Sequence, residues 1–275
     1  MEFAQLVFLL VLPVLGSAGI SDDKRITSGY DAELGRFPFI TSYQYNYNHY
    51  CAATIITPYW LYTAAHCIET VESISNFNIQ NLRVVAGINN LQITVPGKQV
   101  KNVVKQFKHH RYNKLNFFND IGLVLITGGF NFMNGVAAAP ISIPDNSYLT
   151  IAGWGYRSSS NPQVSLRLQY AVGYRISNQE CQTLINVPNA IVTSNMTCFL
   201  GYYQQTEASC NGDSGGPVLQ QYPPNYEYKL IALIDWDVKP CGSYNKPSVG
   251  TLIYPYISWT DCITYYQNSA SCTSF

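Results

Sequence analysis

Short runs of β-branched and aromatic residues, separated by Gly, Pro and Asn, recur along the chain from Tyr30 onward. They cover residues 37–43, 53–57, 82–87, 100–107, 121–126, 166–172 and 228–236. A helical spacing of three to four residues is found only near the end, from Tyr256 to Tyr266. The pattern predicts an all-β sandwich or barrel set with one terminal helix.

Length and composition fit a globular protein of one large or two smaller units. With 275 residues, 47% of them hydrophobic, the chain can bury a substantial core. Residues 131–144, rich in Gly, Ala and Pro, separate two strand-rich halves and could link them. Lys plus Arg and Asp plus Glu number 16 each. We therefore expect no nucleic-acid partner and no binding to an anionic membrane.

The first 18 residues indicate export. An apolar run from Phe3 to Leu12 precedes Gly16-Ser17-Ala18, which is the pattern of a signal peptide and is too short for a membrane span. A polar segment, residues 19–25, follows it. We therefore expect a secreted, extracellular protein.

The cysteines also favour a secreted protein. Their even number suits four disulfides in an oxidising compartment, although spacing alone leaves the pairing open. No Cys-x-x-Cys pair occurs, so we expect no structural zinc site. The eight are Cys51, Cys67, Cys181, Cys198, Cys210, Cys241, Cys262 and Cys272.

Ser214 lies among glycines in the segment from Ser209 to Pro217. Such a serine can be a nucleophile whose neighbouring N–H groups stabilise an oxyanion, or it can simply belong to a tight turn. A nucleophilic serine needs a base, and His66, among small residues and next to Cys67, is the best candidate. Asp120, at the entrance of an apolar strand, could orient this histidine or cap a turn.

The other three histidines are weaker candidates for the base. His109 and His110 lie in a Lys-rich stretch, where we expect surface residues. His49 precedes Cys51 in a tyrosine-rich segment that we expect to form a loop.

Three motifs in this order resemble the signatures of the chymotrypsin-like (trypsin-fold) serine proteases. They are Thr63-Ala64-Ala65-His66-Cys67, Asn119-Asp120-Ile121-Gly122-Leu123 and Gly212-Asp213-Ser214-Gly215-Gly216-Pro217. Further matches, among them Gly153-Trp154-Gly155, extend the resemblance from Ile26 to Trp259. It implies two packed six-stranded antiparallel β-barrels with the active site in the cleft between them, and a C-terminal helix. The corresponding ranges are 26–275 for the peptidase domain, about 26–135 and 136–255 for the barrels, and 256–275 for the helix and tail.

The resemblance also implies a role for each site residue. His66 is the general base, Asp120 orients it, and Ser214 attacks the peptide bond of a protein or peptide substrate. The backbone N–H groups of Gly212 and Ser214 form the oxyanion hole. No cofactor and no metal are expected.

Activation and disulfide pairing follow from the same resemblance. An activating protease cuts after Arg25, and the new α-amine of Ile26 pairs with Asp213, so the uncut chain is an inactive zymogen. The short propeptide favours digestion or extracellular proteolysis, and protein protease inhibitors are possible partners. The implied disulfides are Cys51–Cys67, Cys181–Cys198 and Cys210–Cys241, which leaves Cys262 and Cys272 for each other.

The substrate pocket departs from the trypsin pattern. Six residues before Ser214, where trypsins carry an acid, stands Ala208, which cannot pair with a cation. Asp235-Trp236-Asp237 replaces the usual Ser-Trp-Gly, so Asp237 should narrow the pocket mouth and give it a negative charge. The opposite wall carries Ser248. We expect chymotrypsin-, elastase- or collagenase-like specificity, similar to that of collagen-cleaving and elastase-like relatives from arthropods, rather than trypsin-like specificity.

Asp235 stands where the family has a serine that hydrogen-bonds the orienting acid. Two carboxylates in a half-buried site cannot both ionise cheaply, so one pKa should rise. Asp235 could hold a proton and donate it to Asp120, point away, or compete for His66.

Two other functions were considered for the chain. A catalytically impaired homologue with a binding or regulatory role is the alternative to an active protease, suggested by Asp235 and Asp237. A metal-dependent hydrolase is not supported, because no His-Glu-x-x-His run occurs. Asn195-Met196-Thr197 is a candidate glycosylation site.

Overall fold

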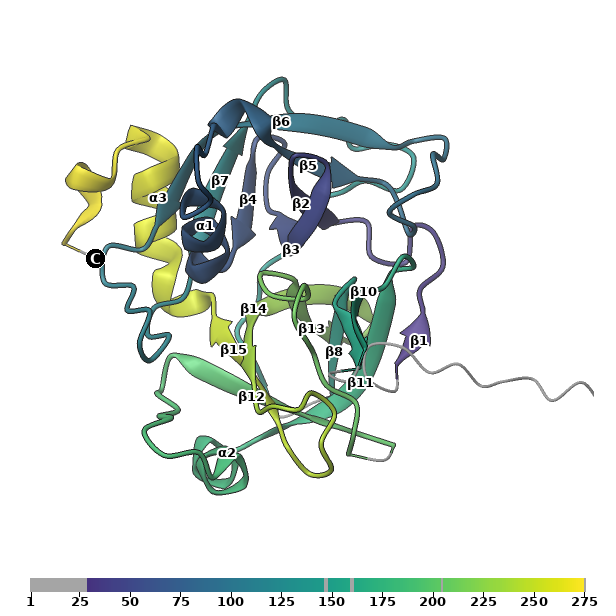
Figure 1. Cartoon of the computed structure of the whole chain (residues 1–275), viewed down its shortest axis with the longest axis vertical. Helices are drawn as coiled ribbons and strands as arrows, with labels where there is room; N and C mark the ends of the chain where they lie inside the picture. Colours follow the sequence, from purple (N-terminus) through teal and green to yellow (C-terminus); the bar gives the residue numbers. More distant parts are fainter. Residues whose placement is uncertain (1–28, 146–147, 159–160, 204, 275) are drawn as a thin grey trace, which may run out of the picture.

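The computed structural model describes residues 29–145, 148–158, 161–203 and 205–274. The signal peptide expected from the sequence lies outside these residues, as do Arg25 and Ile26. The described part of the chain forms two closed six-stranded antiparallel β-barrels and a C-terminal helix (Figure 1). The fold class expected from the sequence is therefore confirmed.

The first barrel is built from the N-terminal half of the chain. Its strands follow the order β2-β3-β4-β7-β6-β5, and β5 pairs back onto β2 to close the sheet. Interior positions carry large apolar side chains such as Ile55, Leu61 and Leu123, all fully buried. The strands are β2 (Ile40–Tyr45), β3 (Asn48–Ile55), β4 (Trp60–Thr63), β5 (Leu82–Ala86), β6 (Gln99–Lys108) and β7 (Gly122–Ile126).

The second barrel is closed in the same way by the C-terminal half. Its order is β11-β12-β15-β14-β13-β8, and β8 pairs back onto β11. The short β1 (Tyr30–Asp31) adds to β11, and β9 (Tyr156–Ser158) with β10 (Asn161–Val164) forms a separate hairpin. The barrel strands are β8 (Tyr148–Gly153), β11 (Gln169–Ile176), β12 (Met196–Gly201), β13 (Pro217–Tyr222), β14 (Glu227–Asp237) and β15 (Ser248–Leu252).

The expectation of a single helix was wrong. The described residues contain α1 (Ala65–Glu72), α2 (Asn178–Ile185) and α3 (Ile257–Tyr266), together with three short 3₁₀ turns. Helices α1 and α2 have eight residues each, about two turns, so too few apolar positions recur to reveal a helical period. The 3₁₀ turns cover Ile79–Asn81, Tyr254–Tyr256 and Ser269–Cys272.

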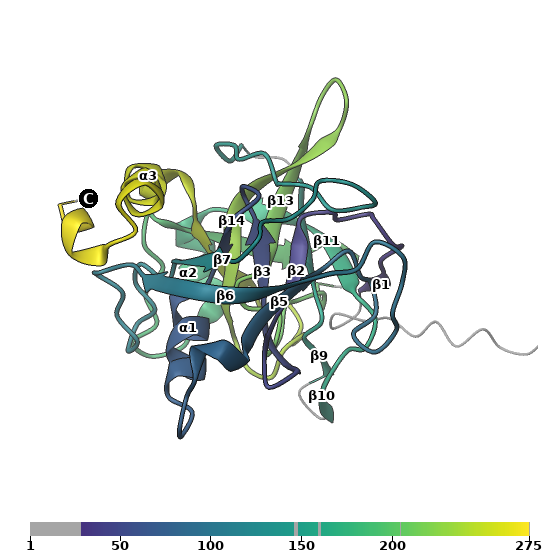
Figure 2. The ribbon, with the colours of Figure 1, turned by 90° about the horizontal axis from the view of Figure 1, so that it is seen from above.

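Helix α3 lies alongside the first barrel although it ends the second half of the chain (Figures 1 and 2). The hydroxyls of Tyr62 and Thr260 are 2.6 Å apart, and the His109 ring packs against Tyr256 and Trp259. The expectation that His109 lies at the surface was therefore wrong. It is 4% exposed, and burial lowers its pKa to about 4. His110 is exposed as expected.

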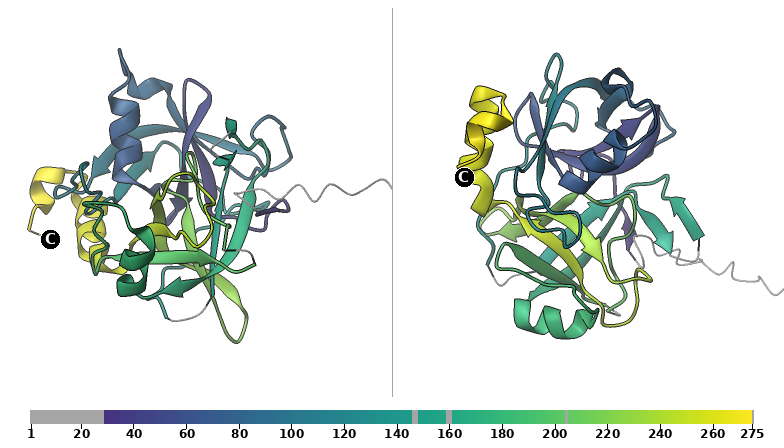
Figure 3. Two further views of the ribbon diagram at one scale, coloured as in Figure 1. Left: turned by 60° about the horizontal axis from the view of Figure 1, so that its bottom comes forward. Right: turned by 60° about the vertical axis from the view of Figure 1, so that its left-hand side comes forward.

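The two barrels lie one above the other in the right-hand view of Figure 3. They are joined by apolar contacts, because one cluster of buried residues includes Leu123 of the first barrel and Leu219 and Leu233 of the second. The backbone N–H of Ala52 in β3 also donates to the carbonyl of Ser214, at 2.9 Å. The serine loop, which is the segment that carries Ser214 between β12 and β13, is thus fixed against β3 of the first barrel.

Candidate active site

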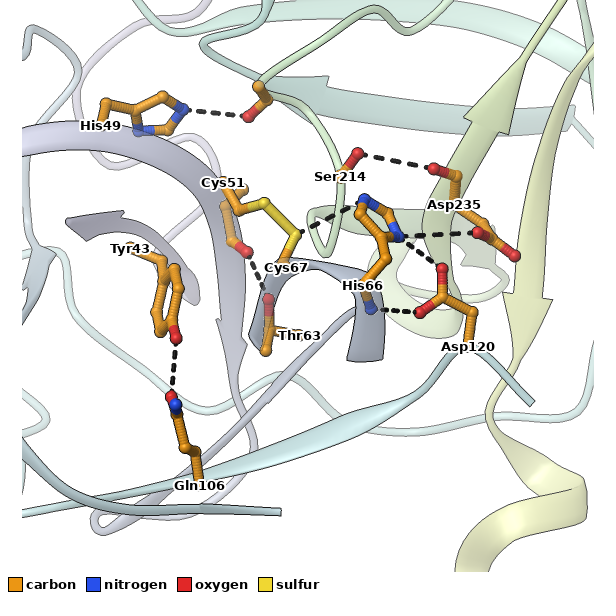
Figure 4. Close-up of a disulfide and its surroundings, with 12 residues drawn as sticks. Tyr43, His49, Cys51, Thr63, His66, Cys67, Gln106, Asp120, Ser214 and Asp235 are labelled. Atoms are coloured by element: carbon orange, nitrogen blue, oxygen red, sulfur yellow. Dashed lines mark hydrogen bonds and ion pairs between the residues drawn. A yellow bond between two sulfur atoms is a disulfide. The ribbon is translucent and has the colours of Figure 1, made fainter. Parts of the chain in front are cut away.

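Ser214 lies in the loop between β12 and β13, and Gly215 lets this loop approach the first barrel. Gly215 has a φ of +75°, and a Cβ there would lie 2.3 Å from Thr63 Oγ1 and 2.5 Å from the Ala52 carbonyl oxygen. Only glycine fits this conformation and this space. The contact places Ser214 next to the first barrel (Figure 4).

His66 is fixed in the first turn of α1. The disulfide between Cys51 and Cys67 ties this turn to β3. The His66 backbone N–H donates to Asp120 Oδ1 at 2.7 Å, and the ring Nδ1 lies 2.5 Å from Asp120 Oδ2. These two bonds hold the backbone and the ring of His66 with one carboxylate, and the His66 side chain remains 20% exposed.

Asp120 is completely buried, two residues before β7. The preceding Asn119 has a φ of +56°, a left-handed conformation that asparagine tolerates better than most residues. Burial by itself raises the pKa of Asp120, but the nearby His66 and the hydrogen bonds from Asp235 and His66 lower it overall. Asp120 is therefore ionised at neutral pH.

Asp235, on β14, is also buried beside this pair. Its Oδ2 accepts a 2.9 Å hydrogen bond from Thr251 Oγ1, and its Oδ1 lies 3.9 Å from His66 Nδ1 (Figure 4). Burial, the charge of Asp120 and a hydrogen bond to Asp120 raise the pKa of Asp235 well above its usual range. Of the two acids, Asp235 is therefore the one that holds a proton more readily.

The hydroxyl of Ser214 faces the same strand. It donates to the backbone carbonyl of Asp235 over 3.4 Å, and in the described part of the chain it makes no hydrogen bond to His66 Nε2. Catalytic hydrogen bonds are often long or misaligned before a substrate binds.

The backbone N–H groups of Gly212 and Ser214 are available to a ligand. Among the described residues, neither group donates a hydrogen bond. Gly212 has a φ of +99°, which favours glycine. The structure thus leaves two N–H groups without a partner in one short loop, as an oxyanion site requires.

His49 was expected to lie in a loop, but it belongs to β3. From this strand it supports the loop that carries Gly212 and Ser214. Its Nε2 lies 2.9 Å from the Gly212 carbonyl oxygen, and its Nδ1 lies 2.8 Å from Ser42 Oγ. Burial lowers the pKa of His49 to about 4, so the neutral ring donates to Gly212 and accepts from Ser42. No local pattern marks this role, because the contact joins residues 163 positions apart.

Asp213 is completely buried, and glycines make room for its carboxylate. It accepts hydrogen bonds from the N–H groups of Gly155 at 2.7 Å and Cys210 at 2.9 Å. A Cβ at Gly153 or Gly155 would lie within 2.3 Å of the carboxylate oxygens. Burial raises the pKa of Asp213 to about 7. This carboxylate is therefore only partly ionised at neutral pH, and a nearby cation would favour its charged form.

Two of the residues expected to line the substrate pocket, Asp237 and Ser248, are neighbours, and both contact Ser209. Ala208 and Ser209 are buried, at 3% and 0% exposure. Ser209 Oγ donates a short hydrogen bond to Asp237 Oδ1, and its backbone N–H donates to Ser248 Oγ at 3.0 Å. Asp237 and Ser248 face each other across β14 and β15. The carboxylate of Asp237 is thus held by Ser209 beside Ser248.

A cavity of about 500 Å³ adjoins this pocket. Its walls come from three segments, 115–117, 187–191 and 236–239, and so include Trp236 and Asp237, two of the residues expected in the substrate pocket. Several apolar side chains here are solvent-exposed, including Leu115 at 86% and Ile191 at 52%. A volume of this size accommodates a large apolar side chain.

Among the described residues, two groups of side chains have the composition of metal ligands. His66, Asp120 and Asp235 offer atoms within 4.8 Å of one another, but a cation there would have to replace the His66–Asp120 hydrogen bond. In the second group, His66 with Cys51 and Cys67, the two sulfurs are joined in a disulfide and are not thiolate ligands.

The cysteines form the four pairs that the family resemblance implies: Cys51–Cys67, Cys181–Cys198, Cys210–Cys241 and Cys262–Cys272. Asn195, the candidate glycosylation site, is half-buried, and its amide donates to the Tyr256 hydroxyl over 3.4 Å. A glycan on this nitrogen would require the amide to turn away from Tyr256.

Comparison with known proteins agrees with this geometry. A family model described as trypsin matches residues 26–260. "Serine protease 1" of Canis lupus familiaris is 29% identical over 256 residues, which are 92% of this chain and 95% of that protein. "Lectizyme" of Glossina austeni is 29% identical over 250 residues, 86% and 85% of the two chains. "Cationic trypsin-3" of Rattus norvegicus is 28% identical over 260 residues, 91% and 96%.

Proposed function

The chain belongs to the trypsin family of serine proteases, and from this premise we propose that Ser214, His66 and Asp120 catalyse its reaction. Its activity is that of a serine endopeptidase, a hydrolase that acts on proteins. The observation that carries the proposal is the pair of bonds from His66 to Asp120 beside Ser214. The ring is held with Nδ1 toward the carboxylate, so that Nε2 is left for the serine.

In the proposed reaction, His66 Nε2 takes the proton of Ser214 as Oγ bonds to the substrate carbonyl carbon. The N–H groups of Gly212 and Ser214 then bind the negatively charged oxygen, each contributing about 3–4 kcal/mol to the transition state. Proton transfer from His66 to the amine breaks the C–N bond and leaves an acyl-enzyme. Water, activated by His66, hydrolyses the acyl-enzyme and restores Ser214.

Activation by cleavage after Arg25 belongs to the same proposal. The buried carboxylate of Asp213 accepts only backbone N–H groups in the described structure, and burial raises its pKa to about 7. An α-amine at Ile26 would supply the missing positive charge and stabilise the serine loop. The full chain would then be a zymogen that needs an activating protease.

We further propose a secreted enzyme with a specificity unlike that of trypsin. The apolar run within residues 1–18 and the four disulfides support export. No helix in the described ranges is long and apolar enough to cross a membrane. Ala208 gives the pocket an apolar floor, which favours chymotrypsin-, elastase- or collagenase-like substrates. Digestion or extracellular proteolysis, subject to protein inhibitors, suits such an enzyme.

Peptide hydrolysis by cut and uncut protein tests the proposal. Protein cleaved after Arg25 should hydrolyse peptides at least about 100-fold faster than uncut protein, because only the cut chain has the amine that orders the oxyanion site. D213N, cut in the same way, should stay near the uncut rate. Equal rates for cut and uncut protein would contradict the activation mechanism.

A further inference from the structure

Asp235 places a third metal-binding side chain beside His66 and Asp120 (Figure 4). His66 Nδ1 lies 2.5 Å from Asp120 Oδ2 and 3.9 Å from Asp235 Oδ1. Imidazole and carboxylate groups are ligands with which proteins bind Zn²⁺, and three protein ligands with one open position form a common zinc site. A serine at position 235, as the family has, would offer only a neutral hydroxyl group. The substitution therefore completes a set of ligands that the serine leaves incomplete.

Each of the two carboxylates is held by one oxygen and presents the other to His66. Asp120 Oδ1 accepts the His66 backbone N–H at 2.7 Å, and Asp235 Oδ2 accepts the hydroxyl of Thr251 at 2.9 Å. The remaining oxygens, Oδ2 of Asp120 and Oδ1 of Asp235, lie on the side of His66 Nδ1. Hydrogen bonds to the outer oxygen orient the ligands of metal sites in this way.

The inner oxygen of Asp235 lacks a donor. Asp235 is 3% exposed, and its Oδ1 has no hydrogen-bond partner among the described residues. A buried acceptor without a partner is costly, and a cation is one way to satisfy it. In the described part of the chain no Lys or Arg forms an ion pair with either carboxylate. A cation between Asp120 and Asp235 would thus have two acids beside it and no competing base.

Small movements would bring the three atoms to the geometry of a zinc site. At bond lengths of about 2.0–2.2 Å and tetrahedral angles, two ligand atoms are about 3.4 Å apart. The separation of His66 Nδ1 from Asp120 Oδ2 would widen from 2.5 Å, and its separation from Asp235 Oδ1 would close from 3.9 Å. Each change is smaller than about 1 Å. The His66 side chain is 20% exposed, so a water molecule can reach the fourth position.

We propose that His66, Asp120 and Asp235 form a binding site for Zn²⁺, and that zinc bound there inhibits the enzyme. Inhibition rests on the serine endopeptidase function given above, whereas binding does not. When Nδ1 of His66 binds the ion, its hydrogen moves to Nε2, and a proton held by Asp235 is released to solvent. Nε2 then carries a hydrogen and cannot accept the proton of Ser214, so the general base is lost.

Equilibrium dialysis against Zn²⁺ measures binding without a substrate. The wild type should bind a zinc ion that D235S and D235N bind at least about 100-fold more weakly, because loss of a ligand costs more than loss of an outer hydrogen bond. T251V, which removes the hydroxyl that orients Asp235, should weaken binding about 10-fold. T251S is its matched control. It keeps the hydroxyl and should bind zinc like the wild type.

Peptide hydrolysis by protein cut after Arg25 measures inhibition. Zinc at about 100 µM should lower kcat/KM of the wild type at least about 10-fold, and a chelator should restore it. D235S and D235N, each compared with its own rate without zinc, should lose this inhibition. Mg²⁺ at the same concentration should have no effect, because it prefers an octahedral set of oxygen ligands.

The H110A variant distinguishes this site from zinc binding at the surface. His110 is exposed, and the centre of its ring lies 4.5 Å from that of His109, so these two rings are the other histidine pair that could attract zinc. No described cysteine is free to offer a thiolate. H110A should therefore be inhibited by zinc to the same extent as the wild type.

The proposal is overturned if the wild type binds no zinc, or binds it without losing activity. Inhibition that persists in both D235S and D235N, or that disappears in H110A, would also overturn it. Labelling with a fluorophosphonate in the absence of zinc separates this failure from that of the proposed function. Protein that reacts at Ser214 but is not inhibited by zinc contradicts the metal site alone. Protein that neither reacts nor cleaves any peptide contradicts the proposed catalysis, and dialysis then still decides whether the site binds zinc.

Discussion

Asp120 and Asp235 are both buried beside His66, and their environments decide which of them more readily carries a proton. Asp120 has two donors from His66, whereas Asp235 Oδ2 has one from Thr251 and its buried Oδ1 has none among the described residues. The additional donors favour charge on Asp120 and leave Asp235 neutral. A neutral carboxyl group can thus donate to Asp120, as the family's serine does at this position.

At the residue scale, the D235S variant distinguishes an Asp235 that donates a proton to Asp120 from one that competes with Asp120 for His66. The pKa of Asp235 is raised, so its neutral form persists to a higher pH than that of an ordinary carboxyl group and is lost as the pH rises through the raised pKa. Activated D235S, which keeps a hydroxyl donor, should match the wild type within about threefold at neutral pH. The alkaline fall in kcat/KM should begin at a lower pH in the wild type than in D235S.

The pH dependence of kcat/KM for the wild type and D235S tests this role of Asp235. The control is D235N, which keeps a donor of similar size and cannot ionise. D235N should follow D235S at alkaline pH. Superimposable profiles for wild type and D235S, or loss of most activity in D235S at neutral pH, would contradict the role given to Asp235.

At the scale of elements, the serine loop and β3 are joined through a glycine that tolerates no Cβ. G215A should lower the free energy of unfolding by about 2–4 kcal/mol, because it adds an unfavourable φ and a collision with Thr63 and Ala52. It should also reduce kcat/KM about 100-fold, since Ser214 would be displaced from His66.

Gly35 provides the matched control for G215A. Its φ is +83°, but a Cβ there would have nothing within 4 Å. G35A should therefore cost only about 1 kcal/mol in urea unfolding and leave kcat/KM unchanged. Equal losses of stability in the two variants would show that the contact with β3 is unimportant.

Elements were predictable where their pattern extends over enough residues. The seven sequence runs overlap β2, β3, β5, β6, β7, β11 and β14. Strand β4, with four residues, and the two-turn helices α1 and α2 were missed because a period needs more residues to appear. Strand β15 has as many residues as the predicted β5 and β7, but Ser248 and Gly250 interrupt its apolar residues. Burial of His109 also escaped prediction, because it depends on α3, about 150 residues farther along the chain.

At the scale of the whole molecule, the site exists only because two barrels meet. His66 and Asp120 come from the first barrel, and Ser214 and Asp235 from the second. The motifs indicated the first three residues and the resemblance supplied their roles, whereas the bond between Asp237 and Ser209 and the support of Gly212 by His49 depend on how distant segments pack. Such contacts leave no local pattern in the sequence.

Fluorophosphonate labelling of protein cut after Arg25 tests the central claim, that Ser214 is a nucleophile activated by His66. Mass spectrometry should find one adduct, on Ser214, formed at least about 100-fold more slowly in H66A and absent in S214A. Folded, cut protein that remains unlabelled at Ser214, or an H66A variant labelled at the wild-type rate, would contradict the account.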